Sequence, residues 1–189
     1  EVGSLETMAP WLAAHPHQID ERFRELVLMP GFIDPHLHPS LAAMLLPLHF
    51  ITAMEWKLPD RTARAVKGHN EYLAAVKEID ASLSEPTEPL ITWGYHKIWH
   101  GEINRTVLNQ LSKSRPIIVW QRSFHEVIAN DAAIDWMGLE RDELEKHPQV
   151  NLQTGAFYES GLSVAMAGMN KYLLDAAQFR QGLELAKQS

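Results

Sequence analysis

The sequence predicts an α/β protein, and three observations support that class. Two short apolar runs, Leu90–Tyr95 (LITWGY) and Pro116–Trp120 (PIIVW), do not alternate with polar residues, which is typical of strands buried on both faces of a sheet. Segments with helical spacing lie before and between these runs. A third apolar run, Leu26–Met29, leads into a further strand-like stretch. Strand and helix alternating along the chain is the order of α/β proteins.

The composition of the chain argues against several classes of protein. The chain has 189 residues, of which 46% are hydrophobic and 22% charged, enough for one globular domain with a core. A net charge of −7 without a Lys/Arg cluster argues against nucleic acid and anionic membrane as partners. No run of 18 apolar residues predicts a membrane span. The absence of cysteine excludes disulfides and thiolate metal sites, and it fits a cytoplasmic location.

The first part of the chain carries weaker signals. We interpret Leu26–Met29 as the start of a buried strand that continues through Gly31–His38, with two prolines limiting its pairing. Leu41–Trp56 is strongly apolar, and Pro47 divides it into short helical pieces or a loop rather than one helix. Asp60–Leu83 is predicted as the longest helix, capped by Asp60. One face of that helix gathers apolar side chains at Val66, Leu73, Val76, Ile79 and Leu83.

Helical segments dominate the second part of the chain. Asn104 and Asp175 stand where helix caps are expected, and Gly138 stands where a helix should end. Val150–Phe157 predicts a weak strand or loop. The predicted helices are Asn104–Leu111, Glu126–Met137, Arg141–His147, Leu162–Leu174 and Asp175–Lys187.

The stretch Met29–Pro39 (MPGFIDPHLHP) holds the strongest chemical signal. His36 and His38 share one side of an extended backbone, because strand side chains alternate with period two. Asp34 has the same parity. Two imidazoles on one side of a strand end can hold a divalent metal ion, which lowers the pKa of bound water. The alternative is a pair of loop histidines bonded to water or backbone.

Here the chain resembles a known family. PGFIDPHLHP is similar to the first-strand signature of the amidohydrolase superfamily, metal-dependent hydrolases built on a (β/α)8 barrel. ITWGYHKIW, then LNQLSKSRPIIVWQRSFHEVIANDAAIDWMGL, then TGAFYESG, resemble amidohydrolase family 3 in order and spacing. The resemblance covers roughly residues 19–189.

The resemblance implies roles for individual residues. It places His36 and His38 as ligands of a divalent metal, most simply zinc. It places His125, Trp93 and Glu159 at the substrate pocket. Each of these residues also has a structural alternative. His125 could cap the next helix, Trp93 could pack in the core, and Glu159 could be a solvated acid in a loop. The resemblance assigns no catalytic residue in this stretch.

The resemblance also implies an incomplete architecture. We expect residues 1–28 to be the tail of an N-terminal β-sandwich-like segment, and residues 29–189 to be the first part of the catalytic barrel with an insertion-like α/β segment. A complete barrel needs roughly 250 residues. The remaining metal ligands of the superfamily come from later strands. Apolar strand faces left open by an incomplete barrel favour association into a homo-oligomer, or a rearranged fold that covers them.

Two functional hypotheses follow. In the first, the chain belongs to a metal-dependent hydrolase that cleaves a non-peptide carbon–nitrogen bond of a small molecule with a metal-activated water. In the second, it is a catalytically silent α/β domain that contributes to a substrate pocket or to oligomerisation. His96 and His100 are spaced i, i+4, but the glycines beside them favour a loop, and no glutamate follows His96 as in a HExxH zinc site.

Overall fold

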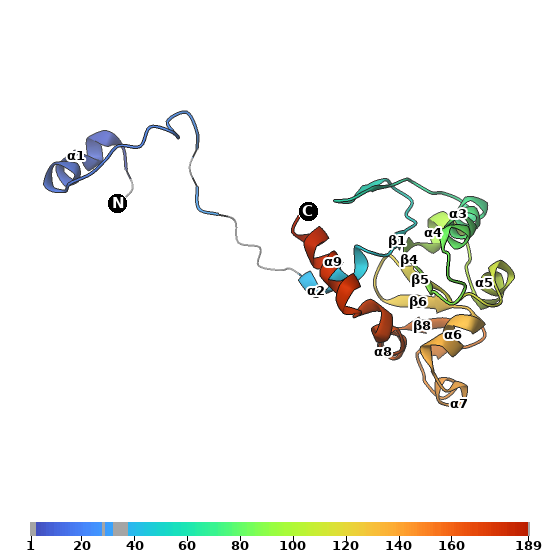
Figure 1. The fold of residues 1–189 in the computed structure, drawn as a ribbon. Coiled ribbons are helices and arrows are strands. Elements are labelled where there is room, and N and C mark those ends of the chain that lie inside the picture. The colour runs from blue at the N-terminus through green and yellow to red at the C-terminus, as the bar shows by residue number, and fades with distance from the viewer. Residues whose placement is uncertain (1–2, 28, 32–37, 189) are drawn as a thin grey trace. The chain divides into compact units, whose positions relative to one another are not determined.

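The computed structural model describes residues 3–27, 29–31 and 38–188. The chain separates into two compact units, Glu1–Leu37 and His38–Ser189 (Figure 1). In the first unit, α1 (Leu5–Ala14) begins at Ser4, whose hydroxyl accepts a hydrogen bond from the Thr7 amide at 3.2 Å. No residue of α1 is buried. Most of the strand expected over Gly31–His38 lies outside the described residues.

The second unit is built on a mixed sheet of six strands in the order β1-β4-β5-β6-β8-β7. Strands β1, β4 and β5 are parallel, and the remaining neighbours are antiparallel. The bounds are β1 His49–Phe50, β4 Leu90–Tyr95, β5 Ile117–Gln121, β6 Glu126–Ala129, β7 Val150–Asn151 and β8 Ala156–Tyr158. The α/β class is therefore confirmed. Within the described residues the sheet is open, so a barrel segment stays a prediction.

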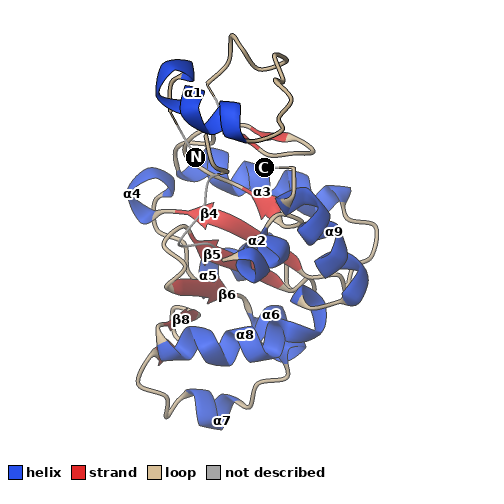
Figure 2. Ribbon diagram, turned by 90° about the vertical axis from the view of Figure 1, so that its left-hand side faces the viewer, coloured by secondary structure: helices blue, strands red, loops and turns tan. Residues whose placement is uncertain are grey.

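Helices cover both faces of this sheet (Figures 1 and 2). The crossover helices α3 (His69–Ser82) and α5 (Arg105–Leu111) pack on one face through Tyr72, Val76 and Leu108. Helices α2 (Pro39–Leu45), α6 (Asp131–Met137) and α8 (Ser160–Leu173) cover the other face. Burial on both sides explains why β4 and β5 lack polar alternation. No helix among the described residues is long and apolar enough to cross a membrane.

Helix α9 (Ala176–Ala186) packs against α2 rather than against the sheet. The backbone of Gly182 lies directly on the carbonyl of Ala43, so a side chain at position 182 would collide with α2. Asp175 caps α9 as predicted, and its carboxylate accepts from the amides of Ala177 and Gln178 at 3.0 and 3.1 Å. The close approach of α2 and α9 at this point therefore requires glycine at position 182.

The helix predicted from Asp60 begins nine residues later. Its first part instead forms β3 (Thr62–Ala63), which pairs antiparallel with β2 (Trp56–Lys57). Arg61 holds this ribbon by donating to the carbonyls of Leu46 and Leu48 at 2.8 and 2.6 Å. Those tertiary bonds outweigh the local capping signal of Asp60, and the prediction of its helix cap is wrong.

The predicted helix Glu126–Met137 is half wrong. Glu126–Ala129 forms β6, antiparallel to β5, and α6 begins only after Asn130. The Asn130 side-chain oxygen accepts from the amides of Ile117 and Ala133, both at 2.9 Å. Its amide nitrogen donates to the carbonyls of Ser112 and Arg115 at 3.1 and 2.9 Å. Asn130 is fully buried with its hydrogen bonds made, which gives it a structural role.

Other predictions from local signals are confirmed. Strand β4 has the expected bounds, and Asn104 caps α5 by accepting from the Val107 amide at 3.0 Å. Gly138 ends α6 in the left-handed conformation, with φ of 70°. The helix α7 (Arg141–Leu144) lies within the predicted charged turn. The weak strand Val150–Phe157 is the hairpin of β7 and β8.

Gly94 interrupts the ladder between β4 and β5. The register shifts between Trp93 and Tyr95, and Gly94 has φ of 112°, a conformation that favours glycine. A Cβ at this position would collide with the Thr52 side chain and lie 2.8 Å from the Ile51 carbonyl oxygen. The chain after β1 can approach β4 this closely only because residue 94 has no side chain.

Gly94→Ala should therefore destabilise the fold by about 3 kcal/mol, from backbone strain together with a steric clash. Gly138→Ala is the matched control, because Gly138 also has positive φ but faces open space. The control should cost about 1 kcal/mol. Urea unfolding followed by circular dichroism measures both. Equal losses in the two variants would show that the close approach at Gly94 contributes nothing.

Candidate active site at the carboxyl edge

The sheet brings several loops to one edge. The parallel strands β4 and β5 end there at Tyr95 and Gln121, and β6 starts there because it runs antiparallel. Strand β8 runs antiparallel to β6, so it also ends at this edge, just before Glu159. We call this the carboxyl edge, formed by residues 96–103, 121–126 and 159. The carboxyl ends of parallel strands are where α/β folds place ligands.

His125 and Glu159, which are 34 residues apart in the sequence, meet at the carboxyl edge. The His125 Nδ1 lies 3.2 and 3.3 Å from the two carboxylate oxygens of Glu159. The Glu159 amide donates to the His125 carbonyl at 3.0 Å. The side chains are 66% and 56% exposed, so both can reach a ligand. A strand follows His125, so the alternative that it caps a helix is wrong.

Glu159 of this pair and Phe124, which precedes His125, have strained backbones. Phe124 has φ of 65° and Glu159 has φ of 48°, and these are the only described non-glycine residues with positive φ. Each such residue costs on the order of 1–3 kcal/mol, and strained residues of this kind cluster at active sites and ligand clamps. The strain makes the carboxyl edge a candidate site on grounds that do not depend on the sequence motifs.

A second polar group at this edge was not predicted. Gln121 donates to the Glu126 carboxylate at 2.8 Å, and Lys97 pairs with Glu102 at 2.6 Å. Burial raises the pKa of Glu126, the nearby charge of Lys97 opposes that rise, and Glu102 adds to it. Glu126 therefore keeps a proton more readily than an exposed glutamate. The sequence signal for this group is the β-branched pair that follows Glu126, Val127 and Ile128. The predicted helix Glu126–Met137 included these residues, so the signal was missed.

The two histidines at i, i+4 are structural. His96 Nδ1 accepts from the Ile98 amide at 3.2 Å and caps α4 (Lys97–His100). His100 is fully buried, and its Nδ1 accepts from the His96 amide at 3.0 Å. Its Nε2 therefore carries the proton and donates to the Val66 carbonyl at 3.1 Å. Both rings are engaged by backbone groups, and the expectation of a loop at this segment is wrong, because Lys97–His100 forms a helical turn capped by His96.

Trp93 lies in an aromatic cluster beneath the carboxyl edge. Its ring centroid lies 5.0 Å from Phe50, 5.3 Å from Trp56 and 5.3 Å from Phe124. Trp120 joins the cluster through Phe124 at 6.0 Å. Trp93 is 3% exposed, so Phe124 and its neighbours separate it from solvent. Its predicted role at a substrate pocket stays a prediction.

Of the predicted metal ligands, only His38 lies among the described residues. His36 and Asp34 fall outside the described residues, and His38 is exposed at the start of α2. Among the described residues, no group of three or more His, Cys, Asp or Glu side chains can hold a metal. Imidazole suits zinc, but a catalytic zinc usually takes three protein ligands. His36 and His38 would therefore need at least one further ligand.

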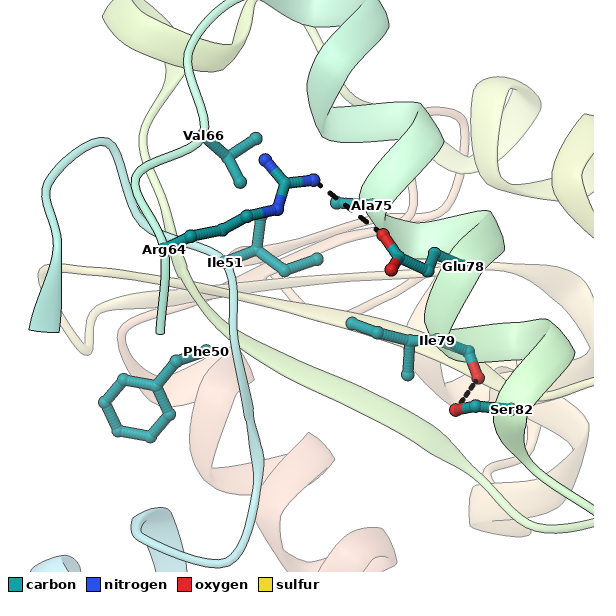
Figure 3. A pocket seen from close by; sticks show the side chains of 8 residues that line it. All are labelled: Phe50, Ile51, Arg64, Val66, Ala75, Glu78, Ile79 and Ser82. Carbon is teal, nitrogen blue, oxygen red and sulfur yellow. Dashed lines mark hydrogen bonds and ion pairs between the residues drawn. The ribbon is translucent and has the colours of Figure 1, made fainter. Parts of the chain in front are cut away.

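A cavity of about 290 Å³ lies on the face of the crossover helix α3 (Figure 3). Arg64 spans it and pairs with Glu78 at 3.8 Å. The remaining lining is largely apolar and includes none of the predicted site residues. The lining residues are Phe50, Ile51, Arg64, Val66, Ala75, Glu78, Ile79 and Ser82.

Two solved structures are similar to this chain. One is an uncharacterized metal-dependent hydrolase from Pyrococcus horikoshii OT3, with a TM-score of 0.58 at 20% identity, covering 85% of this chain and 28% of that one. The other is an uncharacterized metal-dependent hydrolase from Pyrococcus furiosus, with a TM-score of 0.57 at 20% identity, covering 85% and 29%. This chain thus spans under a third of either. No family model and no curated protein matches it.

The neutral state of His100 makes stability depend on pH. Burial lowers the pKa of His100 below its ordinary 6.5, and burial together with Arg61 lowers that of His49. Above pH 6.5 both rings are neutral in the folded and unfolded chain. As the pH falls below 6.5, the unfolded chain takes up protons first, so stability falls until the lower folded pKa values are passed.

We expect the free energy of unfolding to decline between pH 7 and pH 5, and His100→Gln to make that decline shallower. His49 accounts for a remaining part. Urea titrations at several pH values measure the slopes. An unchanged slope in His100→Gln would show that His100 is not the group responsible.

Proposed function

We propose that this chain is part of a metal-dependent hydrolase that cleaves a non-peptide carbon–nitrogen bond of a small molecule. The observation that carries the proposal is the coincidence of two independent features. The sequence holds the amidohydrolase-like PGFIDPHLHP, and the fold is similar to two proteins described as metal-dependent hydrolases. The carbon–nitrogen specificity comes from the sequence resemblance alone.

The connectivity of the sheet is compatible with a barrel-type architecture. Strands β1, β4 and β5 are parallel neighbours in chain order, and both crossover helices between them lie on the same face. Both crossover helices lie on one face in a barrel segment and also in each half of a doubly wound sheet, so it is the amidohydrolase-like sequence that favours the barrel. We infer that the chain is a segment of an incomplete (β/α)8 barrel, and that residues 1–28 belong to a preceding segment.

Different residues of this chain would bind the metal and the substrate. His36 and His38 would hold the metal, most simply zinc, which when bound activates water for hydrolysis. At the carboxyl edge, the exposed His125–Glu159 pair would hydrogen-bond polar groups of the substrate. Burial raises the pKa of Glu126, whose carboxylate accepts from Gln121 at 2.8 Å, and Glu126 would add a further polar contact to the substrate there.

A second candidate has its own supporting observation. The described residues hold no complete set of metal ligands, which fits a silent α/β domain that contributes to a pocket or to a homo-oligomer. Exposed apolar side chains on the second unit, such as Ile98, Trp99 and Leu174, fit an association surface. Metal binding discriminates between the two candidates.

We expect the purified chain to bind about one zinc ion, and the double variant His36→Ala/His38→Ala to bind it more than about tenfold more weakly. The chain offers a matched control, because His15 and His17 form a second, exposed His-x-His pair. His15→Ala/His17→Ala should bind zinc like the unchanged chain. Equilibrium dialysis with elemental analysis measures all three.

Two results would contradict the proposal. Equal losses in the two double variants would indicate nonspecific binding by surface histidines. Zinc at background level in every sample would leave the silent domain as the better description of this chain.

A further inference from the structure

Two buried hydrogen-bond donors on neighbouring strands have no acceptor among the described residues. They are the indole Nε1 groups of Trp93 on β4 and Trp120 on β5. These residues are direct partners in the parallel register and are only 3% and 2% exposed. A buried donor without an acceptor carries its full desolvation penalty, and each such group calls for an explanation, such as a bound water, an ion or a ligand. Two of them side by side indicate an acceptor that binds there.

The position of the two indoles suits a ligand. Trp93 lies two residues before the end of β4, and Trp120 lies one residue before the end of β5. Both are on the sheet face opposite the crossover helices α3 and α5. This is the face that α2, α6 and α8 also cover, and both indoles lie near the edge where parallel α/β folds place ligands.

Phe124 covers this pair of indoles. Its ring stacks on Trp93 at 5.3 Å with an interplanar angle of 29°, and it meets Trp120 edge-on at 6.0 Å and 76°. Its backbone has φ of 65°, which a bulky residue rarely adopts. The aromatic ring thus holds a stacking position at the cost of a strained backbone, in the loop that connects β5 to β6.

We propose that Trp93 and Trp120 form a subsite for a planar ring that carries a carbonyl oxygen, and that Phe124 occupies the ring position until the ligand displaces it. The ligand ring replaces Phe124 in the stack on Trp93, and its carbonyl oxygen accepts from the indole N–H groups. Displacement also relieves the strained backbone at Phe124. The subsite rests on the proposed function in one respect. The substrate class that the subsite names is a cyclic or aromatic amide, which contains the kind of carbon–nitrogen bond that the proposed hydrolase cleaves.

The test uses the full chain, without metal and in the presence of EDTA. Indole N–H signals of the ¹⁵N-labelled chain are assigned with Trp93→Phe and Trp120→Phe, and are followed during titration with benzamide. We expect saturable downfield shifts of the Trp93 and Trp120 signals, with little change at Trp136, which lies on α6. Toluene has the ring without the carbonyl, and it should produce no downfield shift.

Variants separate the parts of the subsite. Phe124→Gly tolerates positive φ and removes the competing ring, so its benzamide affinity should rise roughly tenfold. Trp93→Phe and Trp120→Phe keep a ring but lose a donor, so the affinity should fall roughly fivefold in each. Trp136→Phe is the control and should bind benzamide like the unchanged chain.

Three outcomes would overturn the subsite. These are unshifted Trp93 and Trp120 signals at millimolar benzamide, equal responses to benzamide and toluene, or an affinity that Phe124→Gly leaves unchanged. Any of them would mean that the two tryptophans only pack the core. Because no metal is present, this result is independent of the zinc measurement on His36 and His38. Either proposal can fail while the other stands.

Discussion

The hydrogen bonds of Asn130 hold together the part of the sheet on which the candidate site depends. One buried side chain begins α6, accepts from the first amide of β5 and donates to two carbonyls before that strand. It thereby fixes where β6 ends relative to where β5 begins, which aligns the two antiparallel strands. That alignment places Glu126 and His125 beside the end of β5. Replacing Asn130 with an apolar residue would leave four backbone groups without partners.

The sequence predicted elements whose signals are local. The runs LITWGY and PIIVW become β4 and β5 because burial on both faces requires continuous apolar residues, and Asn104, Asp175 and Gly138 end or begin helices through bonds to their own neighbours. The prediction failed where tertiary contacts decide. Asp60 has the form of a helix cap, but Arg61 binds carbonyls near β1 and holds the segment as a ribbon.

The candidate site likewise combines residues that local signals identify with contacts that depend on tertiary structure. His125 and Glu159 were each identified from the sequence. Their contact depends on the pairing of β6 with β8, and no local sequence pattern predicts that pairing. Glu126 was hidden because its segment was interpreted as helix. The unpartnered indoles of Trp93 and Trp120 depend on the register of two strands 27 residues apart, which only the fold reveals.

The covering of β4 and β5 on both faces has a consequence for how such a protein can change during evolution. A polar replacement in either strand would bury an unsatisfied group and endanger folding. At the carboxyl edge Ser123, His125 and Glu159 are exposed, whereas His100, Ile103 and Phe124 are packed. Replacing the exposed residues can therefore change what this edge binds, while the sheet beneath them stays unchanged. Because helices cover both faces of the sheet, β4 and β5 tolerate few replacements, whereas the exposed residues at the carboxyl edge tolerate more.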